Sequence, residues 1–130
     1  AKNDVLFARL RPYLNKVYRA EFAGTCSPEF HVLRMKDTSN VLPDYLAVAL
    51  RSKLIVSQTK YMMTGNTHPR LTDEDIVNLV LPLPDISIQG EIVLEVERRR
   101  REAQTLRQEA ETLWQNAKAR FEQALLGVGN

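Results

Sequence analysis

The sequence has few of the residues that catalysis, metal binding and membrane insertion require. It contains one cysteine and two histidines, so no disulfide can form within the chain, and it has neither an HExxH nor a CxxC spacing. Its five glycines form no GxGxxG or Walker arrangement, which argues against the common phosphate-binding loops. No apolar run approaches the roughly 20 residues of a membrane span, and no basic-then-apolar signal segment is visible. We expect a soluble protein of the cytoplasm with no membrane contact.

The remaining composition is that of an ordinary globular protein, but the charge is unevenly distributed. The 130 residues are 44% hydrophobic and 26% charged, which is enough for one domain with a core and one appendage. Residues 1–70 contain eleven basic and five acidic residues, residues 71–85 four acidic and no basic ones, and residues 86–130 seven of each. The basic excess of the first half suggests an anionic partner, although an ordinary solvated surface explains it equally well.

The first 85 residues predict a mixture of short strands and short helices. Three segments that are apolar or alternate in polarity predict strands, at residues 4–10, 16–19 and 30–35. Pro43 predicts the first turn of a helix, and the turn-rich residues 64–69 predict a loop. Thr72 is placed to cap a further helix whose first turn is acidic. The expected class is α+β, in a small mixed domain of residues 1–85.

Residues 86–126 predict one long helix, and residues 127–130 a short tail. No proline occurs from Ser87 to Leu126, and the one glycine, Gly90, lies in the first turn. About forty residues at a rise of ~1.5 Å each span about 60 Å, which is longer than the preceding domain should be wide. A helix of this length cannot bury itself against so small a domain, so we expect another helix to pack along it.

Heptads written from Val96 give this helix a coiled-coil pattern. Position a is Val96 followed by four alanines, and position d includes the exceptions Arg99 and Arg120. Small side chains at position a favour the close approach of two helices. The expected helix-pairing residues are Ile92, Val96, Ala103, Leu106, Ala110, Leu113, Ala117, Phe121 and Ala124.

The charges beside this pairing surface leave the orientation of the partner helix open. Glutamates at position g face arginines at position e in a parallel self-dimer, which is favourable. An antiparallel pair, with a second copy or with a different sequence, is also open. The four consecutive arginines of residues 98–101 resemble a nucleic-acid patch, but the glutamates around them favour a salt-bridged helix face.

The sequence predicts no catalytic residue and no metal site. Cys26 and His31 could form a nucleophile–base pair, but a buried structural cysteine beside a strand explains Cys26 more simply. The acidic residues 73–75 could bind a cation, but capping of a helix explains them more simply. We therefore expect a binding protein and not an enzyme.

Two segments combine the cationic, amide and hydroxyl groups that contact phosphates and base edges. Each of these residues taken alone is more simply explained as an ordinary surface side chain. Only when the two segments are considered together is nucleic-acid binding an equally good explanation. The candidate DNA-binding residues are Arg9, Arg11, Tyr13, Asn15 and Lys16 in the first segment, and Lys60, Thr64, Asn66, His68 and Arg70 in the second.

Five motifs follow one another along almost the whole chain. They are Asp4–Lys16 (DVLFxRLRPYLNK), Cys26–Arg34 (CSxEFxVLR), Pro43–Ser52 (PEYLxxxLRS, with aspartate for glutamate), a loop from Gly65 to the Arg70-Leu71 pair, and Leu81–Gln89 (PLPxxxxQ). This series resembles the specificity (S) subunits of type I restriction–modification systems.

The resemblance implies a non-catalytic component for sequence-specific DNA recognition. S subunits bind double-stranded DNA through two target recognition domains, each for one half of a split site. Their two long helices form an antiparallel spacer on which methyltransferase (M) subunits dock. S-adenosylmethionine and ATP are then expected only on the M and restriction (R) subunits, so this chain needs no cofactor. Residues 1–85 become a partial target recognition domain, and residues 86–126 a coiled-coil spacer helix.

The chain holds one partial recognition domain and one helix where the family has two of each. It is therefore expected to be a C-terminal fragment, a truncated gene product or a dimerising half-subunit. Its helix then pairs with one from the missing part of the chain or from a second copy. The alternative function is a coiled-coil assembly module without DNA binding of its own.

Overall fold

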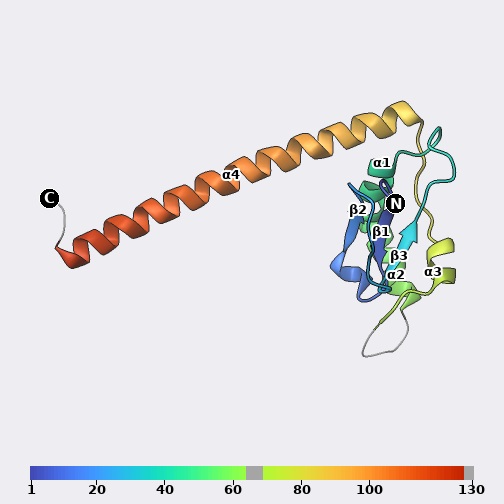
Figure 1. Cartoon of the computed structure of the whole chain (residues 1–130), viewed down its shortest axis with the longest axis horizontal. Coiled ribbons are helices and arrows are strands. Elements are labelled where there is room, and N and C mark those ends of the chain that lie inside the picture. The colour runs from blue at the N-terminus through green and yellow to red at the C-terminus, as the bar shows by residue number, and fades with distance from the viewer. Residues whose placement is uncertain (64–68, 128–130) are drawn as a thin grey trace. The chain divides into compact units, whose positions relative to one another are not determined.

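The computed structural model describes residues 1–63 and 69–127 (Figure 1). The chain divides into two compact units, residues 1–93 and residues 94–130. The first unit contains a small sheet, short helices and the first two turns of a long helix, and the second contains the rest of that helix. None of the helices in the described ranges is long and apolar enough to cross a membrane.

Three antiparallel strands form the sheet, in the order β2-β1-β3. The central strand β1 (Val5–Ala8) pairs with β2 (Val17–Arg19) and with β3 (Phe30–Leu33), so all three predicted strands are present in shortened form. A turn of 3-10 helix, η1 (Pro12–Leu14), connects β1 and β2. Because proline fixes φ and has no amide hydrogen, the first strand cannot continue past this point.

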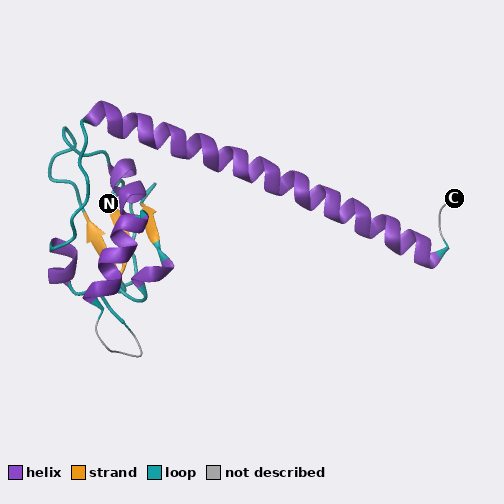
Figure 2. Ribbon diagram, turned by 180° about the vertical axis from the view of Figure 1, so that it is seen from behind, coloured by secondary structure: helices purple, strands orange, loops and turns teal. Residues whose placement is uncertain are grey.

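Helices α1 (Pro43–Leu50) and α2 (Lys53–Met62) cover one face of the sheet (Figure 2). Strand residues alternate between the two faces, so Val5 and Phe7 point toward these helices and are at most 1% exposed. The core that they enter also contains Val17, Leu46, Leu50, Ile55 and Leu71. Leu33 of β3 is partly buried and packs against this core.

Helix α2 was not predicted from the sequence, and it contains Lys60 of the second candidate DNA-binding segment. The helix begins after Ser52, whose side-chain oxygen accepts a hydrogen bond from the Ile55 amide. Ile55 and Thr59, four residues apart, form its buried face. Lys53, Ser57, Gln58 and Lys60 make the helix polar on average, so no long apolar run marks it in the sequence.

Helix α3 (Asp73–Val77) begins with the predicted cap at Thr72. The Thr72 hydroxyl oxygen accepts from the Asp75 amide at 3.1 Å, and the Asp75 carboxylate accepts from the Thr72 amide at 2.7 Å. This reciprocal capping box satisfies two amides at the helix start. The Thr72 amide, followed by its hydroxyl, holds the pKa of Asp75 below its usual value.

Side chains of the helices bind the extended segment between α3 and the long helix α4 (Ile86–Leu126). The Gln58 amide group forms two hydrogen bonds with the backbone of Val80, donating at 2.7 Å and accepting at 2.9 Å. The Tyr45 hydroxyl donates to the Pro82 carbonyl at 2.7 Å. These contacts replace the strand pairing that a proline-rich segment cannot form.

Gln89, in the first turn of α4, is fully buried and makes three hydrogen bonds. Its amide nitrogen donates to the carbonyls of Asn40 and Pro84 at 2.8 Å each, and its amide oxygen accepts from the Leu42 backbone at 3.0 Å. The side chain therefore joins the start of α4 to the loop that precedes α1.

Beyond its first turns, α4 is a solvent-exposed helix that ends at Gly127, which has a φ of 65°. Every residue from Glu97 to Leu126 is exposed. Glu95 pairs with Arg98 at 2.8 Å and with Arg99 at 2.6 Å, and these two guanidinium groups lower the pKa of Glu95 to about 2. The salt-bridged face expected in the arginine run is therefore present at these positions. The pairing of α4 with a second helix stays a prediction.

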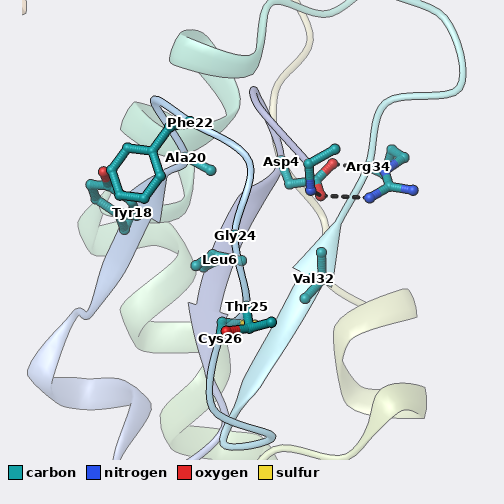
Figure 3. Close-up of a pocket in the computed structure, with 11 residues that line it drawn as sticks. Asp4, Leu6, Tyr18, Ala20, Phe22, Gly24, Thr25, Cys26, Val32 and Arg34 are labelled. Carbon is teal, nitrogen blue, oxygen red and sulfur yellow. Dashed lines mark hydrogen bonds and ion pairs between the residues drawn. The ribbon is translucent and has the colours of Figure 1, made fainter.

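The face of the sheet opposite α1 and α2 borders a cavity of about 320 Å³ (Figure 3). Leu6, Tyr18 and Val32 of the three strands line it, and the loop that carries Phe22 and Cys26 crosses over it. Cys26 is exposed, which corrects the expectation that it is buried. The loop lies on this second face in place of a helix and leaves the thiol in solvent.

An ion pair lies at the rim of this cavity, between buried Asp4 and exposed Arg34. The Arg34 guanidinium donates to both carboxylate oxygens of Asp4, at 2.8 and 2.7 Å. These hydrogen bonds hold the pKa of Asp4 far below its usual value. They connect the beginning of β1 to the end of β3.

We expect Gln89→Met to lower the free energy of unfolding by about 2–3 kcal/mol, because it leaves a buried amide and two carbonyls without partners. The measurement is urea denaturation of the full chain followed by circular dichroism. Gln115→Met on exposed α4 is the matched control, since the Gln115 side chain makes a single hydrogen bond among the described residues, to Glu111. Equal losses for the two variants would contradict this role of Gln89.

We expect Asp4→Asn to destabilise the fold at pH 7 and to lose this effect in acid. The lowered pKa of Asp4 means that its ionised form stabilises the folded state above the unfolded pKa of about 4. As pH falls below that value, the unfolded chain takes up the proton first, and the difference between the variant and the natural chain shrinks. Denaturation midpoints across acidic pH test this. Glu21→Gln, at an exposed residue, should show no such trend.

Candidate nucleic-acid interface

The two segments that carry the predicted DNA-binding residues pair at one end of the sheet. The Arg11 amide donates to the Pro69 carbonyl at 3.0 Å, and the Leu71 amide donates to the Arg9 carbonyl at 2.9 Å. Leu10 and Arg70 form an isolated antiparallel bridge between them. On its other side, the Arg9 amide donates to the Glu29 carbonyl at 2.8 Å. Arg9 and Arg70 are thereby brought to the same edge.

Arg9 contacts Asp73, the first residue of α3. One terminal guanidinium nitrogen lies 3.0 Å from a carboxylate oxygen of Asp73. The same oxygen lies 2.9 Å from Nδ1 of His31, whose Nε2 lies 3.1 Å from the Leu71 carbonyl oxygen. His31 is buried, Arg9 is 32% exposed and Asp73 is 79% exposed. The carboxylate thus joins a buried ring to a partly exposed guanidinium.

A second ion pair lies beside this one. The Arg70 guanidinium donates to one carboxylate oxygen of Glu29 at 2.9 Å. The other carboxylate oxygen of Glu29 and the Nε of Arg9 are buried and have no hydrogen-bond partner among the described residues. Each arginine is therefore held by one carboxylate oxygen of its partner.

The other predicted residues of the first segment surround η1. Arg11 and Asn15 adopt left-handed backbone angles, with φ of 50° and 55°, on either side of it. The Asn15 side chain donates to the Arg51 carbonyl at 2.8 Å, so it supports the turn and does not point away from it. Arg11, Tyr13 and Lys16 are exposed.

In the second segment, Lys60 is exposed near the end of α2, and α2 packs against η1. Within the described ranges, Lys60 makes no ion pair, and neither do Arg11 and Lys16 of the first segment. Thr64, Asn66 and His68 lie outside the described residues.

His31, Asp73 and Glu29 were not predicted from the sequence as members of this cluster. Each contacts a partner that is distant in the chain, and no local spacing predicts such a pair. The alternation of β3 was the available signal for His31, because it places His31 opposite Phe7 on the helix-covered face.

The structure separates the proposed nucleophile–base pair of Cys26 and His31. His31 lies on the buried face of the sheet, whereas Cys26 lines the cavity on the opposite face. Both ring nitrogens of His31 already contact other groups. No cluster of three or more histidine, cysteine or acidic residues with metal-binding geometry occurs among the residues described.

The family model described as "Type I restriction modification DNA specificity domain" matches residues 1–109. The chain belongs to this family. The specificity subunit of the type I restriction enzyme EcoDI from Escherichia coli is 27% identical over 106 residues, which cover 79% of this chain and 22% of that protein.

Two solved structures are also similar. A crystal structure of the HsdS subunit from Thermoanaerobacter tengcongensis matches with a TM-score of 0.68 and 36% identity, over 85% of this chain and 30% of that one. A structure that describes complex assembly and conformational transition of the type I R-M system matches with a TM-score of 0.69 and 35% identity, over 92% and 33% of the two chains. The chain thus spans between about a fifth and a third of the length of these relatives.

The comparisons confirm the family and the fold class that the motifs predicted. The fold is a small three-stranded antiparallel sheet with short helices, followed by one long helix that fits a coiled coil, and it matches the HsdS structure. Specificity subunits are generally non-catalytic. No comparison assigns a role to individual residues, so the DNA-binding and helix-pairing residues stay predictions.

Proposed function

We propose that this chain is a DNA-recognition and spacer part of a type I specificity subunit that works in the cytoplasm. Residues 1–85 contact one half of a bipartite site, and α4 fixes the distance to the other half. Catalysis and the cofactors S-adenosylmethionine and ATP reside on the methyltransferase and restriction subunits. Membership of the specificity family is the observation that carries this proposal.

The charges at the paired end of the sheet support DNA binding there. Arg11, Lys16 and Lys60 are exposed and lack carboxylate partners within the described ranges. Because η1 packs against α2, these cations lie on neighbouring elements. Unpaired cations of this kind neutralise phosphates and release counterions. Arg9 and Arg70, each held by a carboxylate, are suited to a fixed contact with a phosphate or a base edge.

The second unit supports assembly. Leu106, Leu113, Trp114 and Phe121 are each at least 58% exposed along one helix. Exposed apolar side chains in heptad register are typical of a helix that packs against another one. We propose a partner helix from the rest of the subunit or from a second copy, with M and R subunits bound to the assembled pair.

The same exposed residues also favour the second candidate function, a coiled-coil assembly module that binds no DNA itself. The two functions differ in one measurable quantity, the DNA affinity of the intact complex with and without residues 1–85. An affinity that survives the deletion supports the assembly module.

We expect Lys16→Glu and Lys60→Glu each to weaken DNA binding by the complex and to reduce the slope of log K against log salt by about 1. Fluorescence anisotropy over a series of salt concentrations measures both quantities. Lys118→Glu changes the net charge equally but lies on α4, where Lys118 is 3.9 Å from Glu122. If all three variants behave alike, the effect is one of net charge and these two residues are not contacts.

We expect deletion of the gene to remove one split motif that carries N6-methyladenine from the source genome. Single-molecule methylation sequencing with and without the gene tests this. Loss of the motif shows that the chain is a working specificity component. The gap between the two halves of that motif gives the spacing that the helix sets. An unchanged methylome in a strain whose other type I subunits are expressed contradicts the proposal.

A further inference from the structure

His31 is surrounded by hydrogen-bond acceptors on both sides of its ring. Nε2 faces the Leu71 carbonyl at 3.1 Å, and Nδ1 faces the Asp73 carboxylate at 2.9 Å. A carbonyl and a carboxylate can only accept, so both contacts are hydrogen bonds only when both ring nitrogens carry a proton. A neutral ring loses one of the two.

The carboxylate that His31 contacts is also the partner of Arg9. Both cationic groups approach the same oxygen of Asp73, at 2.9 and 3.0 Å. A protonated His31 therefore takes part of the negative charge that otherwise acts on Arg9 alone. The Arg9 Nε has no hydrogen-bond partner among the described residues, so Asp73 is the group that fixes the guanidinium.

We infer that His31 and Asp73 are positioning residues that make the DNA contact of Arg9 stronger at acidic than at basic pH, an inference that rests on the proposed function. Protonation of His31 adds one positive charge next to the phosphate site and weakens the hold of Asp73 on Arg9. Both effects strengthen DNA binding as the pH falls. Imidazole is the side chain whose charge ordinarily changes between about pH 5 and pH 8.

The other charged groups near His31 do not reverse this direction. Asp75 on α3 interacts electrostatically with His31 and is held in its ionised form by Thr72. Glu29, at the start of β3, pairs with Arg70 and not with His31. The Asp75 carboxylate attracts positive charge at His31 and does not repel it, and the pair of Glu29 and Arg70 is neutral as a whole.

The test is DNA affinity as a function of pH at constant ionic strength, measured by anisotropy with a mixed-sequence duplex and the full chain in its complex. We expect affinity to fall about three- to tenfold from about pH 5.5 to pH 8, the effect of one charge near a phosphate. His31→Gln should abolish this dependence. Lys118→Gln, which removes one charge from α4, should keep it.

A second pair of variants tests the inference even if His31→Gln does not fold. Asp73 is 79% exposed, and its replacement leaves the capping box of Thr72 and Asp75 intact. Asp73→Asn should tighten DNA binding more than Glu74→Gln, which removes an equal charge from the same helix turn without touching Arg9. Equal tightening by the two variants, or a full pH dependence in folded His31→Gln, overturns the inference.

Arg9→Ala separates this inference from the proposed function. If Arg9→Ala leaves the DNA affinity unchanged, Arg9 does not contact DNA. That result refutes both the contact and its regulation by His31. A weakened affinity in Arg9→Ala, together with an undiminished pH dependence in His31→Gln, leaves the DNA contact in place and refutes only the coupling to His31.

Discussion

The side chain of Gln89 joins parts of the first unit that the sheet does not reach. Prolines at positions 82 and 84 cannot donate to a strand ladder, so the segment before α4 cannot be held as a fourth strand. Its carbonyls are bonded by side chains, with Tyr45 at Pro82 and Gln89 at Pro84. Because Gln89 belongs to α4 and also bonds to Asn40 and Leu42, the start of the long helix depends on the same buried amide.

The parts of the fold that were predicted from the sequence are those with a local cause. Pro12 ends β1, Thr72 caps α3 and Gly127 ends α4, and each effect arises within a few residues. Helix α2 was missed because its buried face consists of little more than Ile55 and Thr59. The exposure of Cys26 was missed because only the course of the chain over the second face decides it.

The candidate site could be predicted only in part. Residue types identified Arg9 and Arg70 as possible contacts, and the pairing of their segments places them at one edge. Their carboxylate partners, Asp73 and Glu29, were not predicted because each pair joins distant segments of the chain. The hydrogen bond from the Asn15 side chain to the Arg51 carbonyl was not predicted for the same reason.

The cations at this edge divide into two kinds with different physical consequences. Under the proposed function, lysines that lack a carboxylate partner among the described residues, such as Lys16 and Lys60, keep their side-chain entropy until a phosphate binds, and they would provide affinity that salt screens. An arginine held by a carboxylate binds more weakly per charge, but its direction is already fixed, so less entropy is lost when it contacts a base or a phosphate. Arg9, held by an oxygen of Asp73 that His31 also contacts, is of this second kind. Sequence discrimination requires a guanidinium of fixed direction, whereas attraction to any DNA requires only free charge. A domain that recognises a DNA sequence therefore needs both kinds of cation next to each other. For the same reason, a carboxylate beside an arginine is compatible with DNA binding.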